Sequence, residues 1–329
     1  MPILNFDGRA YEGHEKETVL DILLKAGKEI SHSCKTGRCQ GCILHCKEGD
    51  LLPVSQNGLG EELTKEGYFL SCKCPLRHNL EVASPETHTF FQEATVVKKR
   101  QFSDTICQIT LKVDPDFEFL PGQFVNLGRH EGVLRSYTLA GLPTEAGVIE
   151  IHVEKRPAGE LSNWLYSDCR VGETLLLQGP HGQFYYRPDS RDQNLLLLGN
   201  GTGLASLMGV LKSAISNGHK GHIALYYNSD RLTGFYMHQT LRELEQKYES
   251  FHYFPCFSSL YFREGFRQGR ADEAAFRDFP SLSGWKVYAA GFPSMVYTAC
   301  SRARAAGVKV EDIFEEPFEM KDLRRTPRM

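Results

Sequence analysis

Four cysteines constrain this chain more tightly than any other feature of its sequence. Three lie close together with the spacing C-x4-C-x2-C and the fourth follows well downstream: Cys34, Cys39, Cys42 and Cys72. This is a spacing with which four thiolates hold a [2Fe–2S] cluster. The loop also contains Gly37 and Gly41. We expect glycine at both positions because the backbone must reach unusual φ values and pass close to sulfur.

A structural zinc site is the alternative interpretation of these cysteines. Zinc favours two C-x2–4-C pairs, and Cys39 with Cys42 makes one of them. Cys72 and Cys74 are separated by only one residue, however, and Cys34 would be left over. The sequence therefore favours the iron–sulfur cluster. The choice of Cys72 over Cys74 as the fourth ligand rests on spacing alone.

Size and composition describe an ordinary globular protein of two or three domains. The chain has 329 residues, of which 41% are hydrophobic and 24% charged, with a formal net charge of −3. This charge gives no general attraction to nucleic acid or to a membrane surface, and no apolar run approaches the roughly 18 residues of a membrane span. The first residues lack the layout of a signal peptide. Ten cysteines in such a chain suit metal-bound and free thiols in a reducing cytoplasm.

Residues 1–85 predict a small β-grasp-type α+β unit around the cysteine loop. A helix is expected over 18–27, and Gly27 is a suitable end for it. The buried face of this helix would carry Val19, Ile22, Leu23 and Ala26. Strands are expected over 43–49 and 79–83, and the segment 64–72 returns the fourth cysteine to the loop.

The pattern then changes to short alternating strands, which predict an antiparallel β-barrel over 92–188. The expected strands cover 94–97, 106–113, 123–127, 136–139 and 148–153. Among them lies Arg135-Ser-Tyr-Thr138, which combines a guanidinium suited to phosphate with a flat ring and a hydroxyl. Alone, this four-residue pattern has little specificity. A glycine turn at Gly159 opens a helix whose N-terminus could receive a phosphate.

A third pattern predicts a doubly wound parallel α/β domain over 192–322. Residues 194–199 form a continuous apolar strand, which is typical of a strand buried on both faces of a sheet. The glycine-rich loop 199–206 follows and opens a helix, as in dinucleotide sites with the pyrophosphate at the helix N-terminus. The loop lacks the G-x-G-x-x-G pattern, but strands and helices alternate after it. Ligands of such sheets bind beyond the carboxyl ends of the strands, here at 199–206 and 290–295.

In this order, the three patterns resemble the reductase components of bacterial multicomponent oxygenases, ring-hydroxylating or related. Those proteins belong to the ferredoxin–NADP reductase superfamily and carry an N-terminal plant-type ferredoxin domain. The resemblance covers nearly the whole chain. It implies an oxidoreductase that passes electrons from NAD(P)H through FAD, with FMN less favoured, to a [2Fe–2S] cluster. The acceptor would be an oxygenase component or a separate ferredoxin.

The resemblance also implies roles for individual residues. Arg135 would hold the flavin phosphate, with Ser136 beside it. Tyr137 would pack on the isoalloxazine ring and Thr138 would approach N5, which makes these two the candidate catalytic residues. The other implied cofactor-binding residues are His152 and Val153 on the strand lining the flavin, Gly159, Leu161 and Ser162 at its pyrophosphate, Gly201, Thr202 and Gly203 at the nicotinamide dinucleotide, and Gly291 and Phe318 near the two rings.

The chain departs from the family pattern at three positions. Asn200 and Ser206 interrupt the usual Gly-Gly-Thr-Gly and Ala-Pro sequence, which leaves the mechanics of the loop intact. Ala290 stands where the family usually carries a cysteine near the nicotinamide. We expect the binding site to be retained and the rate or geometry of hydride transfer to differ.

The choice of dinucleotide is less determined by the sequence. Asp230 would favour a free ribose 2′-hydroxyl, whereas Ser229 and Arg231 could hold a 2′-phosphate. The habit of the family favours NADH over NADPH. Two other functions stay open: a reductase with a different acceptor, such as a quinone or another reductive enzyme, and a non-catalytic redox-sensing electron-transfer subunit.

Overall fold

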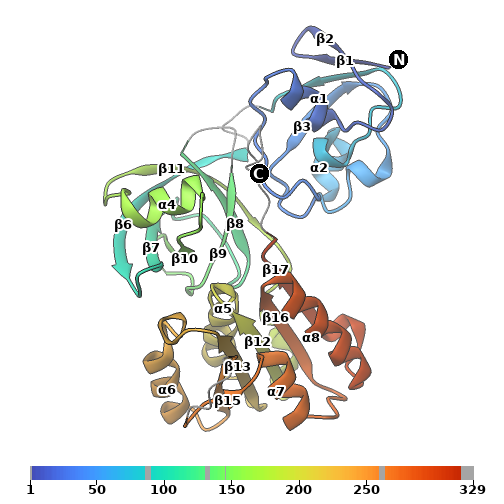
Figure 1. Ribbon diagram of the computed structural model, residues 1–329. Coiled ribbons are helices and arrows are strands. Elements are labelled where there is room, and N and C mark those ends of the chain that lie inside the picture. Colours follow the sequence, from blue (N-terminus) through green and yellow to red (C-terminus); the bar gives the residue numbers. More distant parts are fainter. Residues whose placement is uncertain (1, 86–89, 130–133, 145, 259–263, 320–329) are drawn as a thin grey trace.

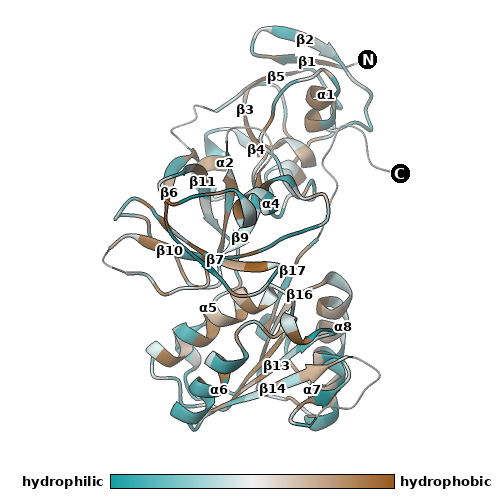
Figure 2. Cartoon of the chain, turned by 60° about the vertical axis from the view of Figure 1, so that its left-hand side comes forward, coloured by the Kyte–Doolittle hydropathy of each residue, from teal (hydrophilic) through white to brown (hydrophobic). Residues whose placement is uncertain are grey.

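The structure, a computed structural model, describes residues 2–85, 90–129, 134–144, 146–258 and 264–319. Three units, each built on its own sheet, follow one another along the chain, with the antiparallel unit between the other two (Figure 1). Hydrophobic residues gather on the inner strands and hydrophilic ones on the outer faces of the helices (Figure 2). Within the described ranges, no helix is long and apolar enough to cross a membrane.

The N-terminal unit is a mixed five-stranded sheet in the order β2-β1-β5-β3-β4. β1 and β5 pair in parallel, and the other neighbours are antiparallel. The elements are β1 (Ile3–Phe6), β2 (Arg9–Glu12), α1 (Val19–Lys25), β3 (Ile43–Glu48), α2 (Glu61–Lys65), β4 (Tyr68–Leu70) and β5 (Leu80–Ala83). The long loop between α1 and β3 carries the first three cysteines of the motif.

The predicted first helix is present but shorter than expected. It begins after Thr18, whose Oγ1 accepts a hydrogen bond from the backbone N–H of Asp21 at 3.2 Å. Ala26 is the C-cap and is exposed, so its predicted place on the buried face is wrong; Leu20 is buried instead. Gly27 leaves the helix with a φ of +78°, a conformation that glycine adopts without a steric cost.

The middle unit is a six-stranded antiparallel sheet in the order β10-β7-β6-β11-β8-β9. An antiparallel bridge between Leu139 and Ile151 joins its two ends and closes it into the predicted barrel. The elements are β6 (Gln92–Gln101), β7 (Ile106–Lys112), β8 (Phe124–Gly128), β9 (Arg135–Thr138), β10 (Val148–Glu154), α4 (Glu160–Ser167) and β11 (Thr174–His181). The strand β11 was not predicted. It lies between β6 and β8 and is needed to complete the barrel.

The C-terminal unit is a six-stranded parallel sheet in the order β15-β14-β13-β12-β16-β17, flanked by helices (Figure 1). Its elements are β12 (Leu195–Asn200), α5 (Gly203–Ser216), β13 (Ile223–Ser229), α6 (His238–Lys247), β14 (Phe251–Phe257), β15 (Arg267–Gln268), α7 (Ala271–Asp278), β16 (Lys286–Gly291), α8 (Pro293–Ala305) and β17 (Ile313–Pro317). The prediction of a doubly wound parallel sheet is confirmed.

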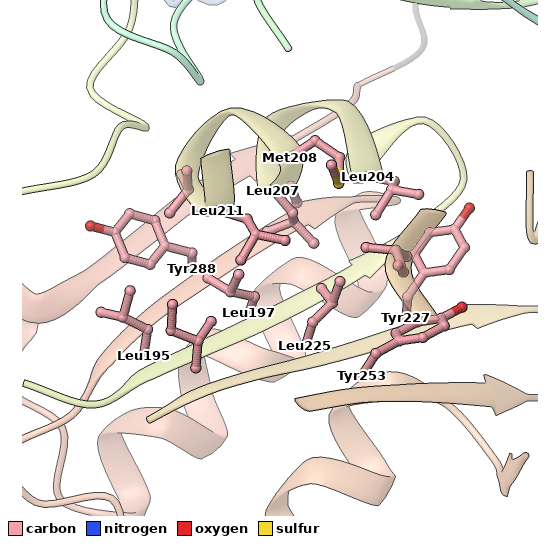
Figure 3. Packing of buried hydrophobic residues seen from close by; sticks show 14 of the residues in the cluster. Leu195, Leu197, Leu204, Leu207, Met208, Leu211, Leu225, Tyr227, Tyr253 and Tyr288 are labelled. Atoms are coloured by element: carbon pink, nitrogen blue, oxygen red, sulfur yellow. The ribbon is translucent and has the colours of Figure 1, made fainter. Parts of the chain in front are cut away.

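Side chains of β12 alternate between two hydrophobic cores, one on each face of this sheet. Leu195 and Leu197 join the core beneath α5 (Figure 3), whereas Leu196 and Leu198 face α7 and α8. All four are fully buried, and truncating such a leucine to alanine costs about 2–5 kcal/mol. This central strand therefore holds the glycine loop that follows it in a fixed position.

Candidate functional site

The four predicted cluster cysteines form two pairs. Cys39, Cys42 and Cys72 are buried and Cys34 is half-buried. The thiol of Cys34 lies within hydrogen-bond reach of the Cys39 thiol, and the thiol of Cys42 is within reach of Cys72. Two thiolates for each of two irons is the ligand set of a [2Fe–2S] cluster.

Two further observations separate this arrangement from a zinc site. Across the described residues, no three His, Cys, Asp or Glu side chains converge as they would around a single metal ion, whereas structural zinc needs four ligands around one point. Cys74 lies apart from the two pairs, close to Ser55, and burial raises its pKa to about 12. Such a thiol is an inert part of the core.

Backbone N–H groups surround the sulfur atoms of the first pair. The amides of Thr36 and Cys39 donate to Cys34 Sγ, both at 3.3 Å. The amides of Cys34 and Gly41 donate to Cys39 Sγ at 3.3 and 3.5 Å. The neighbouring Cys39 thiol and the donors from Thr36 and Cys39 lower the pKa of Cys34 despite its burial, whereas the neighbouring Cys34 and burial raise the pKa of Cys39. Within this pair the thiolate form that binds iron is therefore favoured at Cys34. Bonds of this kind also tune the reduction potential of a cluster.

The loop reaches this shape through left-handed backbone at Lys35, Gly37 and Gln40, with φ of +53°, +87° and +55°. The expectation for Gly37 is confirmed. The expectation for Gly41 is wrong, because its φ is not left-handed and an added Cβ would lie 3.6 Å from Cys39 Sγ, an ordinary contact. That Cβ would also lie 3.4 Å from Leu134 of the middle unit, so the loop packs directly on the barrel.

The short strand β9 carries the predicted flavin motif. Thr138 is buried, Arg135 and Tyr137 are half-buried, and Ser136 is exposed. Tyr137 packs against the barrel core, and its burial raises the pKa of its hydroxyl, so the phenol stays neutral. Arg135 Nη1 donates to its neighbour's carbonyl, Leu134 O, at 2.8 Å.

Both ends of β9 touch another unit. At its start, the backbone N–H of Leu134 donates to His32 O on the cysteine loop at 3.1 Å. At its end, Thr138 Oγ1 lies 3.0 Å from Ser206 Oγ in the first turns of α5. A strand of four residues therefore links the cysteine loop to the glycine-loop helix.

The two predicted residues on β10 point in opposite directions. Val153 is part of the barrel core, so only its backbone is available to a cofactor. His152 is buried and contacts Tyr236 Oη at 3.0 Å and Glu150 Oε1 at 3.1 Å. Burial lowers the pKa of His152, which keeps the ring neutral. Its side chain thus joins the barrel to the C-terminal unit.

The helix α4 begins at the predicted glycine turn. Gly159 is its N-cap, and no side chain caps the amides of its first turn. Leu161 packs into the barrel core. An added Cβ at Gly159 would collide with the hydroxyl of Ser162, so that hydroxyl lies over the start of the helix. Unpaired amides at a helix N-terminus suit phosphate.

The glycine loop after β12 adopts the expected strand–turn–helix geometry. Gly201 has a φ of +52°, and Tyr227 Oη donates to its carbonyl at 2.9 Å. Thr202 is the N-cap of α5 with no side-chain cap bond, and its Oγ1 lies 3.4 Å from Glu154 Oε2 at the end of β10. An added Cβ at Gly203 would collide with Ala290 O. Gly203 is therefore needed where the start of α5 passes against the end of β16.

The second loop of this site follows β16. Asn200 Oδ1 accepts a hydrogen bond from the backbone N–H of Phe292 at 2.8 Å. Gly291 has a φ of +127°, and a Cβ added there would collide with Asn200. The backbone N–H of Phe318 donates to Gly291 O at 2.7 Å. Gly291 and Phe318 are therefore neighbours, and Asn200 has a defined role in joining the two loops.

Ala290, at the position where a cysteine was expected, is fully buried and pairs with Glu316 of β17. Burial raises the pKa of Glu316 to about 7, although nearby Arg38 opposes the shift. Arg38 of the cysteine loop also forms a 3.0 Å ion pair with Glu315. The C-terminal strand therefore connects the nicotinamide side of the site to the N-terminal unit.

Comparison with protein families matches each unit separately. Residues 4–77 match the 2Fe-2S iron-sulfur cluster binding domain, residues 93–186 the oxidoreductase FAD-binding domain and residues 197–301 the oxidoreductase NAD-binding domain. The chain belongs to the ferredoxin reductase family with an N-terminal 2Fe-2S domain. This reductase passes electrons from NAD(P)H through FAD to a [2Fe–2S] cluster.

Individual relatives span nearly the whole reductase. The ferredoxin–NAD(P)(+) reductase component of the naphthalene 1,2-dioxygenase system of Pseudomonas putida is 28% identical over 91% of this chain and 93% of its own. The CDP-6-deoxy-L-threo-D-glycero-4-hexulose-3-dehydrase reductase of Yersinia pestis is 25% identical over 96% of this chain and 97% of its own. The crystal structure of a cytochrome P450 reductase from Amycolatopsis superposes with a TM-score of 0.68 at 25% identity, covering 97% and 99% of the two chains.

The residues of the reductase fit its cofactors. The paired cysteines suit two irons. The first-turn amides of α4, which no side chain caps, suit a flavin phosphate, although Glu160 adds a negative charge to that turn. The α5 N-terminus, with no acidic residue in its first turn, suits a dinucleotide. Neither Glu316 nor the contact partner of Thr138 was predicted from the sequence. For Ser206 a signal was present, since it is one of the departures from the family pattern, but its partner lies 68 positions away.

Proposed function

We propose that this reductase supplies electrons to the oxygenase component of a multicomponent oxygenase, or to a separate ferredoxin that serves one. The observation that carries the proposal is the position of β9, which contacts the cysteine loop at Leu134 and the nicotinamide helix at Thr138. The flavin motif therefore lies between the electron entry and the electron exit. The naphthalene dioxygenase relative, which is such a component by name, is similar in sequence to this chain over 93% of its own length.

A bound flavin would supply hydride acceptance from NADH and the release of single electrons, and the protein supplies binding and orientation. We assign the flavin phosphate to Arg135 and the pyrophosphate to the α4 N-terminus at Gly159 and Ser162. Tyr137 offers its ring to the isoalloxazine and Thr138 its hydroxyl to N5. The side chains of Val153 and Leu161 shape the barrel beneath, because both point into its core.

We assign the dinucleotide to Gly201, Thr202 and Gly203, with Gly291 and Phe318 at the nicotinamide end. NADH is favoured over NADPH because the hydroxyl of Ser229 is engaged locally: it donates to Arg231 O at 2.8 Å and accepts from Arg231 N at 3.1 Å. It is thus not free for a 2′-phosphate, and the exposed Asp230 would repel one.

The cluster ligands in this proposal are Cys34, Cys39, Cys42 and Cys72. We further propose that the three cofactor domains span 1–85, 92–188 and 192–322, since each described sheet lies within one of these ranges. A reducing cytoplasm suits the chain, because its cysteines serve as metal ligands and free thiols.

The test uses protein loaded with FAD and cluster and compares two artificial acceptors. Ferricyanide takes electrons from reduced flavin, whereas cytochrome c receives them from the cluster. We expect NADH to support both reactions, and Cys72→Ala to abolish cluster absorbance and cytochrome c reduction while ferricyanide reduction persists. Failure of the wild type to oxidise NADH with either acceptor would contradict the proposal and favour the redox-sensing alternative.

A second candidate acceptor is a reductive enzyme of deoxysugar metabolism. The observation that favours it is the full-length match to the Yersinia dehydrase reductase. The two candidates separate in an acceptor assay in which the reductase is combined either with an oxygenase-system ferredoxin or with a hexulose dehydrase. Faster NADH oxidation with the ferredoxin supports the oxygenase proposal, and faster oxidation with the dehydrase overturns it.

A further inference from the structure

A buried pair of side-chain amides lies between the barrel and the cysteine loop. Asn126 on β8 and Gln178 on β11 are paired neighbours on adjacent antiparallel strands. Their relative exposures are 0% and 3%. Asn126 Nδ2 donates to Gln178 Oε1 at 2.9 Å. Two polar side chains in such a place are costly unless every group is hydrogen-bonded.

Both amides donate to the backbone of the cysteine loop. Asn126 Nδ2 donates to Cys39 O at 2.7 Å, and Gln178 Nε2 donates to Gln40 O at 3.3 Å. Cys39 is one of the four cluster ligands assigned above. The loop carbonyls are thereby satisfied by the barrel, at a point where Cys39 and Gly41 are buried.

The same asparagine is also tied to the flavin strand. Ser136 Oγ, between Arg135 and Tyr137, donates to Asn126 Oδ1 at 2.8 Å. This bond fixes which way the amide points, since its oxygen must face Ser136 and its nitrogen must face Cys39. A continuous series of contacts therefore runs from the flavin motif through Asn126 to a cluster ligand.

We propose that Asn126, supported by Gln178, is a positioning residue for electron transfer from flavin to cluster, an inference that rests on the proposed function. In that step the reduced flavin loses one electron and the cluster gains one, and no bond is made or broken in the protein. The amide pair holds the Cys39 side of the loop at a fixed separation from β9. Without the amide pair, the loop would remain attached through Leu134 and the Arg38–Glu315 ion pair, but its position on the barrel would no longer be fixed.

The variant Asn126→Asp tests this inference because it keeps the shape and removes the donor. A carboxylate there faces the Cys39 carbonyl without a proton to share. Gln178→Ala is a second variant that removes the donor to Gln40 and the acceptor of one Asn126 bond, but leaves the bond from Asn126 to Cys39 in place. The matched control is Gln56→Ala, since Gln56 Nε2 also donates to two backbone carbonyls, at 3.1 and 3.0 Å, but both belong to the N-terminal unit.

Four measurements on the loaded protein separate positioning from general stability. They are the rate of flavin reduction by NADH, ferricyanide reduction, cytochrome c reduction, and hydrogen–deuterium exchange of residues 34–42. For Asn126→Asp we expect the two flavin rates to stay near wild type. Cytochrome c reduction should fall by more than either flavin rate, because electron transfer slows as the separation of flavin and cluster grows, and exchange in 34–42 should rise.

Either of two results would overturn the inference. One is that Asn126→Asp loses no more cytochrome c reduction than ferricyanide reduction. The other is that Asn126→Asp and Gln56→Ala lower cytochrome c reduction equally. If Asn126→Asp does not fold, Gln178→Ala must show a smaller but still selective loss of cytochrome c reduction. If Gln178→Ala shows no such loss, the inference is also overturned. Failure of the proposed function has a different signature, because the wild type itself would then show no NADH-driven reduction of either acceptor.

Discussion

Removing the hydroxyl of Ser206 tests how the flavin strand and the nicotinamide helix act together. Thr138 Oγ1 and Ser206 Oγ lie 3.0 Å apart, and the two residues are 5% and 0% exposed. The variant Ser206→Ala removes one oxygen atom and changes the packing little. It leaves the Thr138 hydroxyl without this partner, in a place that water does not readily reach.

The size of the effect follows from the burial of the two hydroxyls. A hydrogen bond between neutral groups contributes about 0.5–1.5 kcal/mol, and a buried polar group left without a partner costs about 1–3 kcal/mol. If about 1–2 kcal/mol of this serves to aim the Thr138 hydroxyl at flavin N5, flavin reduction should slow by about 5- to 30-fold. The cluster spectrum should not change, because this contact lies at the end of β9 opposite to Leu134, where the strand meets the cysteine loop.

The assay is stopped-flow bleaching of the flavin at saturating NADH for wild type, Thr138→Ala, Ser206→Ala and the double variant. We expect the two single effects to be non-additive, with a coupling of about 1 kcal/mol. Ser216→Ala is the control, since Ser216 lies at the exposed end of the same helix and its Oγ donates only to Ser213 O. A rate for Ser206→Ala within about twofold of wild type, or fully additive effects, would refute the assigned role.

Three further predictions concern the rest of the site. Cys74→Ala should keep the cluster absorbance that Cys72→Ala loses; the reverse would exchange the ligand assignment. Gly203→Ala should destabilise the protein by about 1–3 kcal/mol through overpacking against Ala290 O and raise the KM for NADH, whereas Gly60→Ala, with open space around it, should leave that KM unchanged. Burial raises the pKa of Glu316 from 4.5 to about 7. Between these two pH values the folded state therefore holds a proton that the unfolded state has released. The free energy of unfolding then falls as the pH rises from about 4.5 through about 7. The melting temperature of Glu316→Gln should therefore fall less than that of wild type over this range, and parallel curves would show that Glu316 does not titrate there.

Local sequence patterns predicted the parts of the structure that are built locally. Three of the four cysteines lie on one loop, so their spacing alone indicated the ligand set. The apolar run 194–199 and the glycines after it likewise specify a strand, a turn and a helix within a few residues. The fold class followed because each of the three patterns is typical of one kind of sheet.

Contacts between distant segments were not predictable in this way. The bonds from Asn126 to Cys39 and from Thr138 to Ser206 join residues 87 and 68 positions apart, and no local pattern indicates which residue each one would contact. The exposed Ala26 was misplaced because helical periodicity does not locate the end of a helix. Gly41 was misjudged for a similar reason: the close neighbour that its size accommodates is Leu134, which belongs to another unit.

The central claim is that electrons pass, within one chain, from NADH through the flavin to the [2Fe–2S] cluster that the four cysteines hold. An anaerobic titration of the loaded reductase with NADH tests it most directly, with flavin absorbance and the electron paramagnetic resonance signal of the reduced cluster followed together. We predict that the cluster signal grows as the flavin bleaches. A flavin that bleaches fully while the cluster stays oxidised, although dithionite can reduce it, would contradict the account.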